Sequence, residues 1–386
     1  MMASLLMNLW PGDRRGVRSS FAAIGVLAAA LVFSATPVAL AADTAADPRV
    51  PADLGARLAQ DYAVPATARL AERAARLERS VAGYCQPGAA ADGRADAAAL
   101  ERDFRDTVLA WAGVEFLRFG PLVEANRYER IAFWPDPRGV MQRQVQGLLA
   151  ASETATLDAG TLAGRSVAMQ GLPALEFVLY RDAGLLAATA PDANECAYAR
   201  ALTGALAEVS GEVAAAWSAQ HGFGGAFTQP GAAKERYRSQ REVAAEAIKA
   251  LSGGLQFARD IKLAPLLAEP PSDSRARRAP FWRSGLTIPA MMASAQGLLD
   301  FYAAARWPLD ATATGIDQSL RHELTQWRLT LQDLPAEPVA VLLSQADTRA
   351  RLHLLLLILK NAKDLVDQDL AAHLGIAVGF NALDGD

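Results

Sequence analysis

Residues 100–111 read LERDFRDTVLAW, and this stretch decides the fold class. Leu100, Phe104, Val108 and Trp111 follow one another at steps of four, four and three positions. In an α-helix this spacing places the four side chains on one face, with the polar residues opposite. The stretch therefore predicts an amphipathic helix whose apolar face packs into a core.

Helical signals recur along the rest of the chain. Asp192-x-x-Glu195 and Ser239-x-x-Glu242 have the spacing of capping boxes, which open helices. Residues 352–359 are apolar apart from His353, a composition typical of a buried helix centre and too short to cross a membrane. Few stretches alternate with the period of a strand. We therefore predict an all-α protein of two packed, bundle-like helical domains.

The domain boundary is expected at a break in these helical patterns. The loop at 222–231 contains Gly and Pro, and it divides the mature chain into residues 42–225 and 226–386. The Pro-rich acidic turn at 269–274 competes with it. Both parts also share a short pattern, since Phe-Trp at 133–134 precedes Gln-Gly-Leu-Leu at 146–149, and Phe-Trp at 281–282 precedes the same four residues at 296–299. Duplication of a helical unit is therefore a hypothesis.

The first 41 residues have the organisation of a secretory signal peptide. Three arginines between positions 14 and 18 precede an apolar run at 21–38, and Ala39-Leu40-Ala41 supplies a small-x-small cleavage signature. A transmembrane anchor is the rival interpretation, but Pro37 and the cleavage signature favour removal. The sequence thus predicts a periplasmic protein with no membrane span after cleavage.

The charge balance excludes one class of partner. The formal net charge is −4, and Lys and Arg are dispersed along the chain. Nucleic-acid-binding proteins carry basic patches or stripes. We therefore expect no nucleic acid among the partners.

The chain contains two cysteines, Cys85 and Cys196. In an oxidising compartment they are expected to pair as a disulfide that joins an N-terminal helix to one far along the chain. A catalytic thiol is the alternative. It would need a neighbouring His or another activating group, and none stands nearby in the sequence.

Two charged residues fall on the apolar face of the helix whose stripe begins at Leu100. Glu115 and Arg118 continue the steps from Trp111 and lie on its buried side. A buried carboxylate is costly unless it is paired or hydrogen-bonded. The two residues either pair with each other or with neighbours as a structural contact, or they face a ligand.

A third charge stands alone in an apolar segment. Residues 171–180 read GLPALEFVLY, and Glu176 is their only charged residue. It must enter the core with a partner or line a cavity. Burial would raise its pKa and a nearby Arg would lower it. Both a structural and a functional role remain open.

No metal-binding motif is complete in the sequence. The four histidines are scattered singly, at His221, His322, His353 and His373. His322-Glu323 starts like a zincin helix motif, but position 326 is Gln. There is also no Gly-rich phosphate loop and no G-x-S-x-G elbow.

Several blocks resemble the imelysin-like family. They span nearly the whole mature chain. The first block, residues 111–136, contains Phe119-Gly120-Pro121 and Phe133-Trp134-Pro135-Asp136. The others are residues 170–180, residues 278–283, the C-terminal Leu374-Gly375 and residues 379–386. The resemblance implies a cell-envelope protein of two helical domains associated with bacterial iron uptake, and a nominal metallopeptidase activity.

The family hallmark is G-x-H-x-x-E, which places a His and a Glu one turn apart on a helix. Gly171 and Glu176 fit this frame, but Pro173 occupies the His position and cannot ligate a metal through its side chain. Peptidase chemistry at this motif therefore lacks its most needed group. Iron or zinc remains possible as a cofactor, with Glu176 as the one candidate ligand.

Two functions from different classes compete. The first is a non-enzymatic binding component with a pocket between the two helical domains, whose unknown partner is a small ligand, a metal ion or an envelope protein. The second is a metal-dependent peptidase with a compensating ligand, and a scaffold without a small-molecule site is a third. The expected ligand-binding residues are Glu115, Arg118, Asp136, Glu176 and Arg283.

Overall fold

The computed structural model describes residues 47–86, 93–151, 154, 156–187, 192–268, 273–310 and 313–377. Within these ranges the chain forms helices, turns and loops, and no strand. The prediction of an all-α protein is confirmed. The expected signal peptide at 1–41 and the family-like block at 379–386 lie outside the described residues.

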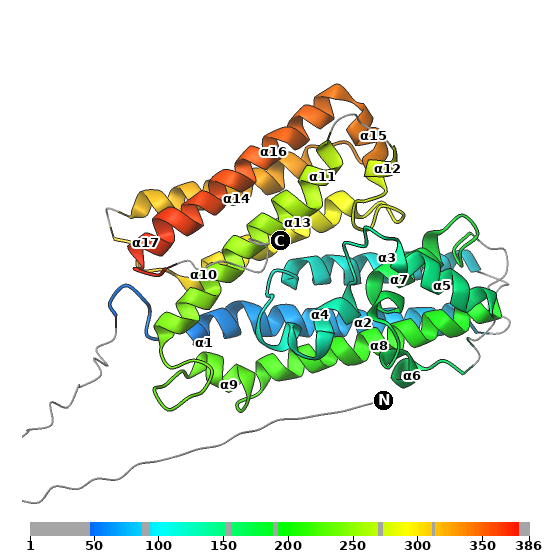
Figure 1. Cartoon of the computed structure of the whole chain (residues 1–386), viewed down its shortest axis with the longest axis horizontal. Coiled ribbons are helices and arrows are strands. Elements are labelled where there is room, and N and C mark those ends of the chain that lie inside the picture. The colour runs from blue at the N-terminus through cyan, green and yellow to red at the C-terminus, as the bar shows by residue number, and fades with distance from the viewer. Residues whose placement is uncertain are drawn as a thin grey trace, which may run out of the picture. The chain divides into compact units, whose positions relative to one another are not determined.

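Three long helices of the N-terminal half lie alongside one another (Figure 1). α2 (Val64–Tyr84) packs against both α3 (Gly93–Val114) and α8 (Ala193–Ser218). The four apolar residues of the stripe that begins at Leu100 are at most 1% exposed. The predicted amphipathic helix is therefore confirmed as α3, with its apolar face in the core.

Four long helices form the C-terminal half. α13 (Thr287–Ala305) packs against α14 (Thr314–Gln332), which in turn packs against α16 (Ala346–Asp364), and α10 (Gln240–Gln256) contacts α16. α13 also packs along α3, and this contact joins the two halves (Figure 1).

Short helices connect the long ones. α1 (Leu54–Leu58) contacts α9 (Phe223–Thr228), α10 and α13, so the first helix of the compact region touches the C-terminal half. The others are α4 (Arg127–Ile131), α5 (Val140–Ala150), α6 (Ala159–Ala163), α7 (Gly171–Tyr180), α11 (Ala264–Leu267), α12 (Asp273–Ala276), α15 (Val339–Ser344) and α17 (Ala371–His373), with 3₁₀ turns η3 (Gly120–Leu122), η4 (Glu124–Asn126) and η5 (Val167–Met169).

Three helices are interrupted by π-helical segments. η1 (Ala59–Ala63) joins α1 to α2, η6 (Phe257–Leu263) joins α10 to α11, and η7 (Leu365–Leu370) joins α16 to α17. A π segment widens the helix by bonding residue i to i+5, and such segments occur often at functional sites. The apolar periodicity of the sequence did not reveal them.

The described residues all belong to one compact unit. The predicted boundary after residue 225 falls within α9. That boundary, and the duplication of a helical unit, remain predictions.

Both predicted helix starts are confirmed. The Asp192 side chain accepts hydrogen bonds from the backbone N–H groups of Asn194 (2.9 Å) and Glu195 (3.0 Å) at the start of α8. Ser239 accepts one from Glu242 N–H (3.4 Å) at the start of α10. These contacts satisfy N–H groups that have no partner within the helix.

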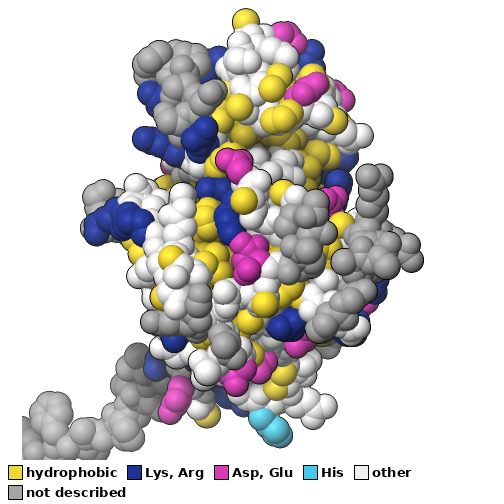
Figure 2. Space-filling view, turned by 90° about the vertical axis from the view of Figure 1, so that its right-hand side faces the viewer, with side chains coloured by type: hydrophobic (Ala, Val, Ile, Leu, Met, Phe, Trp, Pro, Cys, Tyr) yellow, Lys and Arg dark blue, Asp and Glu magenta, His cyan; other side chains and the backbone are white. Residues whose placement is uncertain are grey.

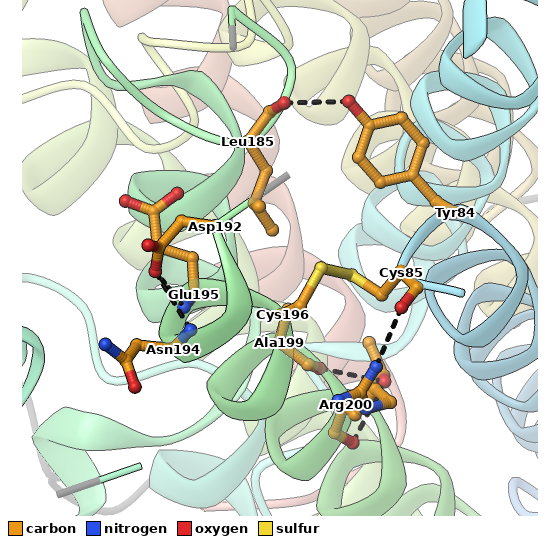
Figure 3. Close-up of a disulfide and its surroundings, with 10 residues drawn as sticks. Tyr84, Cys85, Leu185, Asp192, Asn194, Glu195, Cys196, Ala199 and Arg200 are labelled. Atoms are coloured by element: carbon orange, nitrogen blue, oxygen red, sulfur yellow. Dashed lines mark hydrogen bonds between the residues drawn. A yellow bond between two sulfur atoms is a disulfide. The ribbon is translucent and has the colours of Figure 1, made fainter. Parts of the chain in front are cut away.

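The predicted disulfide is present. Cys85, directly after α2, is bonded to Cys196 in the first turn of α8, with 5.5 Å between the two Cα atoms (Figure 3). The backbone oxygen of Cys85 also accepts a hydrogen bond from Arg200 (3.1 Å). Next to it, the Tyr84 hydroxyl donates to the Leu185 oxygen (2.8 Å).

The prediction that residues 352–359 form a buried helix centre was wrong for one face of α16. Leu352, Leu355 and Leu359 are buried, but Leu354 and Leu357 are 50% and 54% exposed. α16 packs against α14, α10, η6, α15 and α11, but the side that carries Leu354 and Leu357 stays exposed, so the run at 352–359 is not buried all round. None of the described helices is long and apolar enough to span a membrane.

Candidate functional site

Glu115 lies where the C-terminal end of α3 meets the C-terminal half. Its backbone N–H donates to the Trp111 oxygen (2.9 Å), which carries the helical geometry one residue past Val114. Glu115 is 7% exposed, and its side chain accepts hydrogen bonds from the Lys262 ammonium of η6 and from the Ser294 hydroxyl of α13 (2.6 Å). Glu115 is therefore paired, but with partners from the second half of the chain.

Lys262 is equally enclosed. Its side chain is 4% exposed, and its ammonium also donates to the Ser294 hydroxyl (3.3 Å). Burial lowers the pKa of Lys262 below its usual range, while the neighbouring Glu115 carboxylate opposes this shift. Three polar side chains from α3, η6 and α13 thus satisfy one another in a water-poor environment.

Arg118 is held between two aromatic rings. Its guanidinium carbon lies 4.2 Å from the ring centre of Tyr128 and 3.8 Å from that of Phe257, and it donates to the Tyr128 hydroxyl. Such stacking is a favourable cation–π arrangement. The buried Nε of Arg118 has no hydrogen-bond partner among the described residues.

A small cavity separates Arg118 from the Glu115 cluster. Its volume is about 10 Å³, close to the minimum that holds one water molecule. It is lined by Glu115, Phe116, Arg118, Gly254, Phe257, Ala258, Lys262, Ser294 and Leu298. A water there would have a guanidinium, an ammonium, a carboxylate and a hydroxyl around it.

Glu176 belongs to a second cluster. It lies in α7 and is 4% exposed. Its Oε1 accepts hydrogen bonds from the backbone N–H (2.9 Å) and the hydroxyl (2.7 Å) of Ser284. Burial raises the pKa of Glu176, and the Ser284 hydrogen bonds and the Arg283 charge oppose this shift.

The start of α7 explains why Gly171 and Pro173 are compatible with this position. Gly171 has φ +73°, and a Cβ there would lie 2.2 Å from the Ile131 oxygen. Only glycine fits such a close approach of two backbones at positive φ. Pro173 falls in the first turn, where a missing N–H leaves no helical hydrogen bond unmade.

Arg283 lies beside Glu176 and stacks on aromatic rings. Its guanidinium carbon is 4.3 Å from the ring centre of Trp282 and 5.2 Å from that of Phe177. Burial lowers the pKa of Arg283, and the Glu176 carboxylate opposes this shift. The guanidinium also reaches the Gln142 side chain of α5 (3.4 Å).

Asp136 binds backbone. Its two carboxylate oxygens accept hydrogen bonds from the N–H groups of Val140 (2.9 Å) and Met141 (2.8 Å) at the start of α5. A negative charge at a helix N-terminus is favourable. Asp136 therefore holds α5, and α5 carries the Gln142 that Arg283 contacts.

The five predicted residues fall into separate groups. Glu115 and Arg118 line one cavity, and Glu176 and Arg283 lie together in a cluster that does not line it. Lys262, Ser294 and Ser284 are the polar partners that sequence reasoning missed. The local sequence does not indicate that Lys262 and Ser294 contact Glu115, because each lies more than 140 positions away from it. Ser284 directly follows the predicted Arg283 and was the easier one to find.

A metal does not fit the residues around Glu176. In the described part of the chain, no three or more His, Cys, Asp or Glu side chains are grouped to hold a metal ion. Three of the histidines, His221, His322 and His353, are exposed, and Ser284 already donates twice to Glu176 Oε1.

The surface around these helices carries mixed charge. Figure 2 shows one face, on which basic and acidic side chains lie next to each other near the centre among hydrophobic ones. The charges on that face are interspersed.

Comparison with known proteins identifies the family. The sequence model of the imelysin family, peptidase M75, matches residues 63–366. No curated protein matches the chain. Two crystal structures are similar in fold. An imelysin-like protein from Psychrobacter arcticum has a TM-score of 0.68 and 23% identity, covering 86% of this chain and 98% of its own.

The second structure comes from Parabacteroides distasonis and is provisionally named an iron-regulated protein A precursor. Its TM-score is 0.66 and its identity 12%, covering 82% of this chain and 95% of its own. At these identities the two structures support the fold alone. The family model matches well over half of the sequence, and this match establishes the family. The chain belongs to the imelysin family.

Proposed function

We propose that this chain is a non-enzymatic binding component of the bacterial cell envelope, associated with iron uptake and exported to the periplasm by residues 1–41. The main support for the proposal is that the G-x-H-x-x-E motif lacks its His and that its Glu is already hydrogen-bonded. Pro173 stands at the His position, and the Glu176 carboxylate is engaged by the N–H and hydroxyl of Ser284. This arrangement suits a fixed recognition carboxylate better than a metal ligand.

The arginines supply the binding groups in this proposal. Arg118 and Arg283 are each stacked on aromatic rings, and stacking orients a guanidinium while leaving its edge available to an acceptor. The Nε of Arg118 is buried beside a cavity of about 10 Å³, so in this proposal a ligand reaches Arg118 only from its part-exposed side. Glu115, Glu176 and Asp136 then position these arginines and the surrounding helices. The ligand is an organic molecule or an envelope protein with acceptor groups.

The iron context rests on the family and on one neighbour. The name of the Parabacteroides distasonis protein connects that protein with iron regulation. For the present chain this remains part of the proposal.

Two other functions make different predictions. A metal-dependent peptidase is favoured only by the family's peptidase name, and it requires further ligands near Glu176. A scaffold is favoured by the internal pairing of Glu115 with Lys262 and Ser294.

The first experiment measures metal. The mature protein is dialysed against Zn²⁺ or Fe²⁺ and its metal content is determined, together with Glu176→Gln and the exposed control Glu208→Gln. We expect no stoichiometric metal in any of the three. Metal that is lost in Glu176→Gln and kept in Glu208→Gln would contradict the proposal and favour the peptidase.

The second experiment looks for the ligand. Native mass spectrometry is applied to the protein isolated from the periplasm of iron-starved cells. We expect a bound mass that disappears in Arg118→Gln and Arg283→Gln and persists in Arg105→Gln, an exposed arginine of α3. A protein that never carries a bound mass would favour the scaffold.

A further inference from the structure

A second and larger pocket is lined by other residues than the cavity at Glu115. It has a volume of about 290 Å³ and opens between η1, the start of α2 and the C-terminal part of α13. Its lining residues are Asp61, Tyr62, Pro65, Ala66, Arg69, Asp300, Ala303, Ala304 and Arg306.

The lining carries two carboxylates and two guanidiniums above an apolar floor. Asp61 and Arg306 are paired at 2.6 Å and connect η1 to the end of α13. Arg306 is the C-cap of α13, and its left-handed conformation (φ +46°) ends the helix.

Arg69 and Asp300 are the second pair of opposite charges. Arg69 makes no hydrogen bond or ion pair with another described residue, and Asp300 accepts one hydrogen bond, from Gln296 (2.8 Å). Both charges act on the Tyr62 hydroxyl. Burial raises the pKa of Tyr62, Asp300 raises it further, and Arg69 lowers it. A guanidinium without a partner among the described residues and a carboxylate with one hydrogen bond therefore line the same pocket as Tyr62.

The floor of this pocket is fixed by Tyr62. Its hydroxyl donates to the Gly113 oxygen of α3 (2.5 Å), and its ring packs at 5.8 Å from Phe116 and 5.5 Å from Phe301. These contacts leave Tyr62 little freedom to move. The π segment η1 places Asp61 and Tyr62 at the pocket, where a regular helix would orient them differently.

We propose that this pocket binds a small zwitterion of the α-amino-acid class. The carboxylate of such a ligand pairs with Arg69, whose planar guanidinium matches a carboxylate in bidentate geometry. Its ammonium group is taken by Asp300, and its side chain lies on Pro65, Ala66 and Ala303. A ligand with charge of a single sign would leave either Arg69 or Asp300 without a partner.

Titration calorimetry on the mature protein tests this inference. L-Alanine, L-glutamate and L-arginine are the probes, and acetate and methylammonium are the single-charge controls. We expect saturable one-to-one heat from at least one amino acid and none from acetate or methylammonium. Absence of saturable heat with all three amino acids would overturn the inference, as would acetate binding as tightly as the best of them.

Two variants locate the site. Arg69→Gln and Asp300→Asn are each expected to lower the affinity for the tightest-binding amino acid at least about tenfold. This is the usual loss when a charge-assisted hydrogen bond is removed. Arg79→Gln, an exposed arginine of the same helix α2, is the matched control and should bind as the wild type does. Unchanged affinity in both site variants would overturn the proposal. The outcome is independent of Glu176, because none of these residues belongs to its cluster.

Discussion

Glu115 and Lys262 lie 147 positions apart in the sequence and form a buried ion pair. The pair joins the end of α3 to η6, with Ser294 of α13 hydrogen-bonded to both partners. It thus connects the N-terminal and C-terminal helices at their shared core.

Removing one partner of this pair should be strongly destabilising. Lys262→Met leaves the Glu115 carboxylate buried without its cation, and broken buried pairs cost about 3–5 kcal/mol. Urea denaturation of the variant against the wild type measures this loss. In the double variant with Glu115→Gln, part of the loss should be recovered, because no uncompensated charge remains. A loss of less than about 1 kcal/mol in Lys262→Met would show that the pair behaves like a solvent-exposed one.

The raised pKa of Glu176 should make the stability of the protein depend on pH. Its pKa is raised in the folded state above the ordinary value of 4.5, so the folded protein binds the proton more tightly than the unfolded chain. Stability from this group is therefore present below that ordinary value and is lost as pH rises through the folded pKa.

The neutral variant Glu176→Gln lacks this dependence. We expect the unfolding free energy of the wild type, minus that of Glu176→Gln, to fall as pH rises from about 4 to 7. Chemical denaturation at several pH values gives this difference. Glu208→Gln controls for the loss of one exposed negative charge. A difference that increases with pH would mean that the Arg283 and Ser284 contacts outweigh burial.

The disulfide should contribute substantially to stability. It closes a loop with a sequence separation of 111 residues, and on the chain-entropy model a loop of this size contributes about 4–5 kcal/mol. Cys85→Ser combined with Cys196→Ser should lower the unfolding free energy by an amount of this order. Thiol alkylation without reductant should label no cysteine, since both are bonded. Labelling of the untreated native protein would contradict the bridge.

Gly171→Ala should destabilise the start of α7. The new Cβ would lie 2.2 Å from the Ile131 oxygen at φ +73°, and left-handed backbone alone costs a non-glycine residue about 1–2 kcal/mol. We expect a loss of at least about 2 kcal/mol in thermal or urea unfolding. Gly147→Ala in α5 is the control, because nothing lies within 4 Å of its Cβ position. That change should be neutral or stabilising.

The helical architecture could be predicted because apolar periodicity is a local property. The stripe from Leu100 to Trp111 indicated which face of α3 is buried, and its continuation indicated that Glu115 enters the core. The same reasoning could not name Lys262, since η6 lies far along the chain and its lysine reaches Glu115 only in the folded protein. Local patterns thus locate a buried charge and leave its partner unknown.

Asp136 illustrates a different limit. Asp136 was predicted as a ligand-binding residue, yet both of its carboxylate oxygens accept hydrogen bonds from the backbone of α5. Side chains that bind ligands and side chains that satisfy helix N-termini are the same residue types. Only the position of the helix start distinguishes them.

The π segment η6 has a consequence for how the chain tolerates changes in length. Phe257 and Lys262 are five positions apart, both line the cavity at Glu115, and the Lys262 nitrogen lies 5.5 Å from the Phe257 ring centre. In a regular α-helix, residues five apart point about 140° away from each other. Deleting one residue between them would convert the wide turn to an ordinary one and rotate either the aromatic ring or the ammonium out of the core. The number of residues in this segment is therefore as much a requirement of the Glu115 ion pair as the lysine itself.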